Sequence, residues 1–358
     1  SRITFRIASD FCFASCALSL LWSVTRNSFL KTVNVIMMFS RTLRALSTLT
    51  VILGIAIPAW RQLEHSVITH NSESITIAPI VYGIERGFYR REGLDLEFRF
   101  IRADLAAAAI AGSQEIDYMI SSGTAFRAAM RGLPLKILAY SFKKPLFYLL
   151  SQPSITSIQE LKGKRIAVSS PQDTGGLAAK AAIRSAGLDA NQDVVYIAIG
   201  AASVRMAAME AKSVAAAIMP VPWNLRMKQK GYPELSFAGG LLAEPLTGIV
   251  TSAAKVEKNP EQIRKVLRGY LRSLRALRQD RADVTQFIGQ RFNLDADTAA
   301  EVYKIMLGTM SEDGTIPNSV MERLLEDGKR EPGVKRNIAL SDIIDYRLLR
   351  EVVPQVER

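Results

Sequence analysis

The feature that most constrains the fold is an alternation of short apolar segments with longer helical segments, which begins near Ser74. Ile116–Ile120, for example, has the length of a short strand and precedes the helical segment Thr124–Arg131. Parallel strands need long connections, which are usually helices, so this alternation is typical of a parallel sheet. The sequence therefore predicts an α/β fold.

Glycine and aspartate mark several expected helix ends. Gly93 and Gly187 stand where a left-handed residue closes a helix, and Asp104 stands where an N-cap is needed. We expect strands over Ile75–Ala78, Leu94–Ile101, Ile116–Ile120, Leu135–Tyr140, Leu146–Ser151, Arg165–Ser169, Val194–Ile199, Val214–Met219, Leu235–Ala238 and Thr247–Ser252. We expect helices over Ile80–Glu92, Asp104–Ala111, Thr124–Arg131, Ser157–Leu161, Thr174–Ala186, Ser203–Ala211, Pro222–Lys230, Pro260–Asp280, Ala282–Phe292, Ala296–Met310, Ser319–Asp327 and Ser341–Val352.

The order of these elements indicates two α/β units, the second inserted within the first. Two crossover strands would join them, near Phe147–Ser151 and Leu242–Leu246. We therefore expect lobe I to comprise residues 74–148 and 245–358, and lobe II to comprise residues 149–244. Paired crossovers form a hinge, and ligands of open α/β sheets bind at the carboxyl ends of the strands. The sequence thus predicts a cleft between the two lobes.

The first 59 residues indicate a leader. Two arginines in Phe39–Arg44 precede the apolar run Ala45–Ala59, which ends in small residues, as a signal peptide does. Met37 or Met38 would be a natural start, and cleavage is expected near Ala59. The alternative is an uncleaved membrane anchor, although this run of about 15 residues is shorter than the ~20 needed to span a bilayer.

Histidine and cysteine are scarce, and their positions argue against catalysis. Cys12 and Cys16 lie in the leader, while His65 and His70 precede the first expected strand. This placement excludes Ser/His and Cys/His nucleophiles and ordinary zinc sites from the body. Carboxylate or lysine catalysis stays open. We expect a protein without enzymatic activity, metal or cofactor.

The chain carries a net charge of +12, and its densest basic run is Arg264–Arg281. The spacing there is that of an amphipathic helix, so the basic residues are interpreted mainly as a solvated face, with an anionic docking surface as the alternative. A nucleic-acid-binding protein usually concentrates its charge on one face or helix. Because we interpret this basic run mainly as a solvated face, we expect no nucleic-acid partner.

Small polar residues follow three of the expected strands, and these junctions are candidate ligand contacts. Free backbone N–H groups at a helix start attract anions and polar head groups. The candidates at these junctions are Ser122, Gly123, Thr124, Asp173, Thr174, Gly175, Ser203 and Arg205, of which Arg205, in the first turn of its helix, could pair with a sulfonate, carboxylate or nitrate. A fourth candidate position is Trp223 in Pro220–Trp223, which could form a wall of the cleft. The alternatives are that the hydroxyls only cap their helices, that Arg205 is an ordinary surface residue, and that Trp223 packs in the core.

Four stretches resemble periplasmic binding proteins of the nitrate, sulfonate and taurine transporters and of their thiamine-pyrimidine-precursor relatives. They are Gly83–Glu97, Ile116–Gly123, Leu161–Val168 and Ala215–Pro222. The resemblance implies the two-lobed type II fold, a small-molecule ligand in the cleft, a periplasmic or extracytoplasmic location, and a membrane permease with an ATPase as partners of a monomer. One departure is expected, because Ile75–Ala78 runs almost directly into the next helix and the intervening polar loop looks shortened.

Two other functions remain open at this point. The same fold could serve a membrane-anchored sensory or scaffold protein, in which case the leader would not be cleaved. Pyrimidine-precursor synthases of the same superfamily resemble suicide enzymes with an active-site histidine and a cysteine-rich motif. The sequence after Asn71 contains neither.

Overall fold

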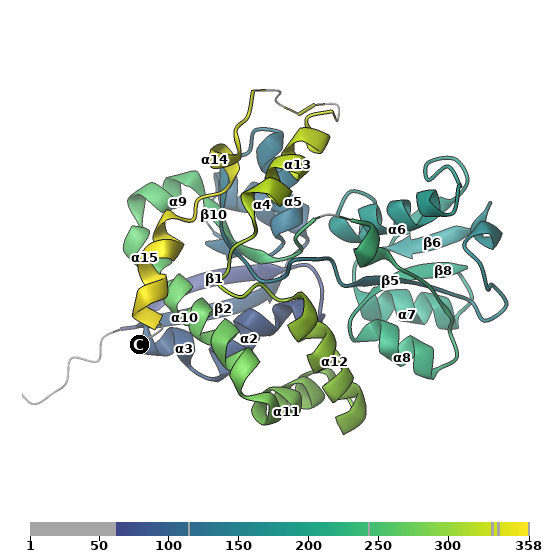
Figure 1. Ribbon diagram of the computed structural model, residues 1–358, viewed down its shortest axis with the longest axis horizontal. Helices are drawn as coiled ribbons and strands as arrows, with labels where there is room; N and C mark the ends of the chain where they lie inside the picture. Colours follow the sequence, from purple (N-terminus) through teal and green to yellow (C-terminus); the bar gives the residue numbers. More distant parts are fainter. Residues whose placement is uncertain (1–61, 114, 243, 331–332, 335–336, 357–358) are drawn as a thin grey trace, which may run out of the picture. The chain divides into compact units, whose positions relative to one another are not determined.

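The computed structural model describes residues 62–113, 115–242, 244–330, 333–334 and 337–356 (Figure 1). Residues 63–358 form one compact unit, to which the following description applies. The leader, its expected cleavage site and both cysteines lie outside the described residues. Within the described part, no helix is long and apolar enough to cross a membrane.

The first sheet has five strands in the order β2-β1-β3-β10-β4. β1 is parallel to both β2 and β3, whereas β10 is antiparallel to its neighbours. The strands are β1 (Glu64–His70), β2 (Leu94–Phe100), β3 (Tyr118–Met119), β4 (Leu135–Tyr140) and β10 (Gly248–Ser252). The lobe built on this sheet also contains α2 (Ala78–Glu85), α3 (Phe88–Arg91), α4 (Ala103–Gly112), α5 (Ser122–Met130), α9 (Ala253–Lys258), α10 (Pro260–Gln279), α11 (Arg281–Phe292), α12 (Ala296–Thr309), α13 (Asn318–Gly328), α14 (Leu340–Ile343) and α15 (Arg347–Val356).

The second sheet repeats this arrangement, in the order β7-β6-β8-β5-β9. β6 is parallel to β7 and β8, and β5 is the antiparallel strand. Its strands are β5 (Phe147–Ser151), β6 (Arg165–Val168), β7 (Val195–Ala198), β8 (Ala216–Pro220) and β9 (Glu234–Phe237). Its helices are η2 (Gln159–Leu161), α6 (Thr174–Ser185), α7 (Ala202–Glu210), α8 (Trp223–Gln229) and η3 (Ala238–Leu241).

In each sheet the antiparallel strand is the first one after a crossover. The chain leaves the first sheet after Tyr140, crosses in residues 141–146 and enters β5 at Phe147. It returns through residues 242–247, as expected, and enters β10. The expected crossover strand Phe147–Ser151 is β5 of the second sheet, and the expected strand Leu235–Ala238 corresponds to β9 of the same sheet. The limits assigned above to the two lobes stay a proposal.

The prediction that Ile75–Ala78 forms the first strand is wrong. Ile75–Ile77 forms the 3-10 helix η1, which continues into α2, and the first strand is Glu64–His70. A short apolar run cannot be told from a buried helical segment by periodicity, and the last five residues of β1 are all buried despite their mixed polarity. The polar residues 71–74 therefore separate β1 from η1, so the expected shortening of this loop is also wrong.

Smaller differences have local causes. The expected helix 80–92 is broken at Gly87, whose φ of 70° ends α2 and starts α3. Asp104 is not an N-cap, because Arg102 occupies that position and pairs with Asp104 in the first turn. The expected last helix divides into α14 and α15. The remaining elements lie where expected, apart from shifts of a few residues at their ends.

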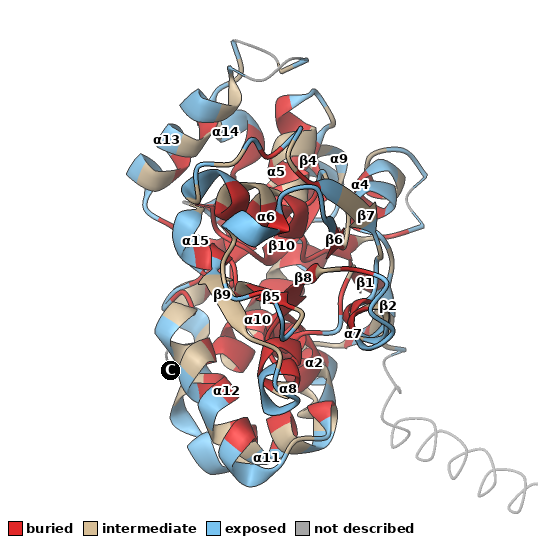
Figure 2. Cartoon of the chain, turned by 90° about the vertical axis from the view of Figure 1, so that its right-hand side faces the viewer, coloured by how far each residue is buried: buried red, intermediate tan, exposed pale blue. Residues whose placement is uncertain are grey.

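The basic run lies on α10, whose opposite face is buried in the core of the first lobe. Figure 2 shows this helix largely buried and the outer face of α11 exposed. The basic side chains are paired with acids rather than only solvated: Arg264 contacts Glu351 of α15, and both Arg268 and Arg272 contact Glu92. These ion pairs therefore connect α10 to α15 and to the end of α3.

Candidate functional site

A polar cavity lies where strands of both sheets end. Its walls come from the loop after β1, the start of α5, the first crossover, the β6–α6 junction and α7. The free space is about 30 Å³, enough for a water molecule or two, so the cleft is nearly closed. The lining residues are His70, Asn71, Ser72, Ser74, Thr76, Ser121, Thr124, Leu146, Phe147, Ser169, Asp173, Thr174, Gly175, Arg205, Pro220 and Leu246.

Arg205 is the principal cation of this cavity, and its side chain is fully buried. Its Nε donates to the carbonyl oxygen of Ile218, and one terminal nitrogen donates to the carbonyl oxygens of Ile199 and Gly200. The other terminal nitrogen has no hydrogen-bond partner among the described residues. Burial lowers the pKa of Arg205 to about 10, so the guanidinium is charged at neutral pH and has one donor group left for an acceptor.

Asp173 faces the same cavity from the start of α6. As the N-cap, it accepts a hydrogen bond from the backbone N–H of Gly176 at 2.9 Å, and its other oxygen accepts from Ser169 at 2.5 Å. Asn71 donates to that oxygen at 3.4 Å. Burial raises the pKa of Asp173, while these hydrogen bonds and the positive charge of Arg205 act in the opposite direction. A cation and an acid thus lie together in one polar cavity.

His70, the last residue of β1, links the loops of the first lobe. Its Nδ1 lies 2.9 Å from the Ser121 hydroxyl, and its Nε2 lies 3.3 Å from that of Thr76. Thr76 is in turn hydrogen-bonded to Ser74. Burial lowers the pKa of His70 to about 3, so the imidazole is neutral at physiological pH and orients the hydroxyl groups around it.

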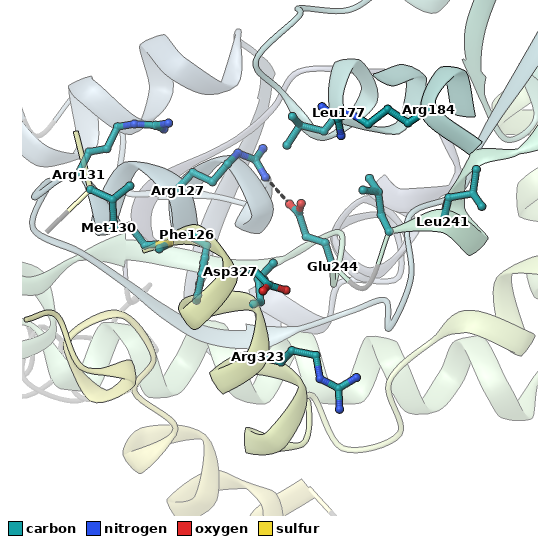
Figure 3. Close-up of a pocket in the computed structure, with 14 residues that line it drawn as sticks. Phe126, Arg127, Met130, Arg131, Leu177, Arg184, Leu241, Glu244, Arg323 and Asp327 are labelled. Atoms are coloured by element: carbon teal, nitrogen blue, oxygen red, sulfur yellow. Dashed lines mark hydrogen bonds and ion pairs between the residues drawn. The ribbon is translucent and has the colours of Figure 1, made fainter. Parts of the chain in front are cut away.

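A buried ion pair closes one side of the cavity. Arg127 of α5 donates to Glu244 at 2.6 Å and to the Thr174 hydroxyl at 3.3 Å. Thr174 donates to the same Glu244 oxygen at 3.1 Å. The side chains of Arg127 and Glu244 are only 13% and 6% exposed, and Figure 3 shows them meeting between α5 and the returning crossover. Groups from both lobes and from the crossover therefore meet at one point.

The structure brings five of the expected site residues to the cavity wall: Thr124, Asp173, Thr174, Gly175 and Arg205. The other four lie elsewhere. Ser122 is buried beneath the wall, and Gly123 packs against Glu244. Ser203 is exposed. Trp223 donates through Nε1 to the carbonyl oxygen of Glu73 at 2.7 Å, and so connects α8 to the loop after β1. Whether any of these residues binds a ligand stays a proposal.

The residues of the first loop were missed because the first strand was misplaced. His70, Asn71, Ser72, Ser74 and Thr76 all line the cavity. A run of small polar residues between Glu64–His70 and the helical pattern was the available signal. The folded part of the chain does contain histidine, contrary to expectation, since it begins with β1 and His70 is buried within the site. Among the described residues, no group of three or more His, Cys, Asp or Glu side chains could hold a metal ion.

Comparison with known proteins agrees with this architecture. Residues 74–282 match the family model described as NMT1/THI5 like. The riboflavin-binding protein RibY of Chloroflexus aurantiacus is 26% identical over 207 residues, which are 56% of this chain and 58% of that protein. The chain thus matches less than two thirds of the length of this relative.

Solved structures show the same fold at low identity. The alkanesulfonate-binding protein SsuA of Xanthomonas axonopodis pv. citri, bound to MOPS, has a TM-score of 0.64 at 17% identity, covering 79% of this chain and 99% of that one. The nitrate-binding protein NrtA of Synechocystis PCC 6803 has a TM-score of 0.67 at 14% identity, covering 83% and 90%. These likenesses and the family match confirm the expected resemblance. The chain belongs to the NMT1/THI5-like family and has the two-lobed type II fold of periplasmic binding proteins.

Proposed function

We propose that this protein is the extracytoplasmic solute-binding component of an ABC importer. It would capture a small polar or anionic organic compound between its lobes and deliver it to a permease and ATPase. The observation that carries this proposal is the buried guanidinium of Arg205, which faces the polar cavity with one donor nitrogen unpaired. A buried donor without a partner costs free energy, and an acceptor group of a ligand would remove that cost.

The cavity also indicates what the ligand offers. Arg205 requires an acceptor, such as a sulfonate, carboxylate or ring carbonyl oxygen. Asp173 disfavours a purely anionic compound, because a carboxylate repels negative charge at close range. A compound that carries both an acceptor and a hydrogen-bond donor, such as an aminosulfonate of the taurine type or a heterocycle, satisfies both groups. The relatives that bind alkanesulfonate, nitrate and riboflavin show that the same fold serves varied ligands.

The function proposed is binding without chemical change. His70 is hydrogen-bonded to two hydroxyl groups, and no carboxylate is hydrogen-bonded to its ring nitrogens among the described residues. The orienting acid of a Ser-His-acid triad is therefore missing from this part of the chain. We propose that the protein acts as a monomer without a cofactor and that its leader directs export.

Isothermal titration calorimetry against taurine, alkanesulfonates, nitrate, pyrimidines and riboflavin tests the proposal. At least one compound should bind saturably and be recovered unchanged. Arg205→Ala should weaken that compound at least tenfold, as expected for loss of a charge-assisted hydrogen bond. Val204→Ala, an exposed change in the same helix, is the matched control and should leave the affinity unchanged. Equal affinity in the Arg205 variant, or recovery of a converted product, would contradict the proposal.

A further inference from the structure

A second, larger cavity lies on the other side of the Arg127–Glu244 pair. Its volume is about 480 Å³, within the range of small-molecule sites. Lobe I contributes α5 and α13 to its walls, and lobe II contributes α6 and the chain after η3 (Figure 3). Arg127 and Glu244 line this cavity, whereas their partner Thr174 lines the cleft. The buried cluster of these three side chains therefore separates two distinct sites.

Apolar side chains from both lobes line part of the second cavity. Phe126 and Met130 of α5 face it from one lobe, and Leu177 and Leu241 face it from the other. Leu241 is 44% exposed, so its side chain is accessible to an occupant of the cavity. An occupant with an apolar body would shield this surface from water, and such burial contributes roughly 25 cal/mol per Å².

The charges around the cavity do not balance. Glu244 is paired with Arg127, and Asp327 lies 3.6 Å from Arg330. Arg184 of α6 and Arg323 of α13 line the cavity from opposite lobes. In the described part of the chain, neither of these two guanidinium groups has an acidic partner within salt-bridge distance. Besides Arg131, which also lines the cavity, Arg184 and Arg323 therefore leave two positive charges at the wall.

We propose that this second cavity, beside the Arg127–Glu244 pair, binds an organic anion with an apolar body, held by Arg184 and Arg323. Because the two arginines belong to different lobes, an occupant that contacts both favours the arrangement of the lobes seen here, in which both line one cavity. The site is independent of the solute cleft proposed above, and either could exist without the other.

Two fluorescent probes that differ by one group test this proposal with the full chain. 1-Anilinonaphthalene-8-sulfonate carries a sulfonate, and N-phenyl-1-naphthylamine has the same ring system without it. The anionic probe should bind saturably with one molecule per chain, and at least tenfold more tightly than the neutral one, because charge-assisted contacts to arginine add to the apolar burial.

Variants locate the probe. The double variant Arg184→Gln/Arg323→Gln should weaken the anionic probe at least tenfold and leave the neutral probe unchanged. Arg99→Gln/Arg102→Gln removes the same net charge from exposed positions on the first lobe and is the matched control. Leu177→Trp should reduce the affinity for both probes by filling the cavity, without changing the charge.

Arg205→Ala distinguishes binding of the probe in the second cavity from binding in the cleft. This variant should leave the affinity for the probe unchanged. Equal affinity of wild type and the Arg184/Arg323 double variant would overturn the proposal, as would loss of the probe in the Arg205 variant alone. Non-saturable binding, or equal affinity for the two probes, would show only general apolar adsorption and would also overturn it. Failure of these tests has no bearing on the calorimetric test of the cleft.

Discussion

Arg127 of α5 donates a 2.6 Å hydrogen bond to Glu244 of the returning crossover, and Thr174 of α6 donates to the same carboxylate oxygen. The chain thus places a buried ion pair where lobe I, lobe II and the crossover meet. A buried pair contributes little net stability relative to apolar replacements, but removing one partner leaves an uncompensated charge. The pair therefore specifies the relative placement of three segments.

Glu244→Gln is expected to destabilise the protein by about 3 kcal/mol, because Arg127 then keeps its buried charge without a counterion. Arg127→Met together with Glu244→Gln should cost less than the sum of the single changes. Urea unfolding of the four proteins of this cycle measures the coupling. Asp104→Asn is the control, since its pair with Arg102 is 60–67% exposed and is worth about 1 kcal/mol or less. A cost for Glu244→Gln no larger than the control would show that the pair is solvated.

Gly123 packs so closely against this pair that a side chain there would force Glu244 or Thr174 to shift. A Cβ atom would lie 1.9 Å from a Glu244 carboxylate oxygen and 2.6 Å from the Thr174 hydroxyl oxygen. Gly123→Ala should therefore destabilise the protein by about 1–3 kcal/mol, as overpacking does. Gly308→Ala is the matched control in another helix, because nothing lies within 4 Å of its Cβ position, and it should be neutral or slightly stabilising. Thermal unfolding of both variants measures the difference, and equal melting temperatures would contradict the prediction.

Part of the fold could be predicted from the sequence, and part could not. The α/β class, most strands and the junctions after β3 and β6 follow from apolar periodicity and from small polar residues after strands. β1 was missed because its sequence, EHSVITH, is polar at most positions although the end of the strand is buried. Its burial results from pairing with β2 and β3 on both sides, which only the tertiary structure specifies.

The candidate site shows the same division between local and tertiary information. Asp173 was predictable as an N-cap, because a local motif determines that role. Arg205 was identified from its position near a helix start, but its complete burial depends on the carbonyl oxygens of Ile199, Gly200 and Ile218 around it. Glu244 could not be identified, since its partners lie 117 and 70 residues away along the chain.

Acid is expected to destabilise the protein through His70. Its pKa is 6.5 in the unfolded chain and about 3 in the folded protein because of burial. The unfolded state therefore binds more protons between these values, and the contribution of neutral His70 is complete above pH 6.5 and is lost as the pH falls toward about 3. The loss should approach about 1.4 kcal/mol per pH unit well below 6.5. His70→Asn should flatten this dependence in urea unfolding at pH 7.5 and 5, and an unchanged pH slope in the variant would contradict the prediction.

Lysine should not be able to replace Arg205 in binding the cleft ligand. The guanidinium donates to three backbone carbonyl groups, and its other terminal nitrogen has no hydrogen-bond partner among the described residues. A lysine ammonium is a point charge on a flexible stem and cannot reproduce this planar arrangement. Arg205→Lys should therefore lose at least tenfold in affinity for the cleft ligand found by calorimetry. Affinity within twofold of wild type would show that charge alone is required.

Trp223 should report closure of the cleft. Its indole N–H donates to the carbonyl oxygen of Glu73 across the two lobes, and the residue is only 7% exposed. Separation of the lobes would break this hydrogen bond and expose the ring to water, so a ligand that favours the closed arrangement should shift the tryptophan emission to shorter wavelength. Trp223→Phe should abolish the shift. Phenylalanine has a smaller aromatic ring and no N–H donor, so the Trp223 variant should also bind the ligand more weakly, because the closed state loses a contact. A ligand-induced shift that persists in Trp223→Phe would show that another tryptophan is the reporter and that the Trp223–Glu73 contact does not change on binding.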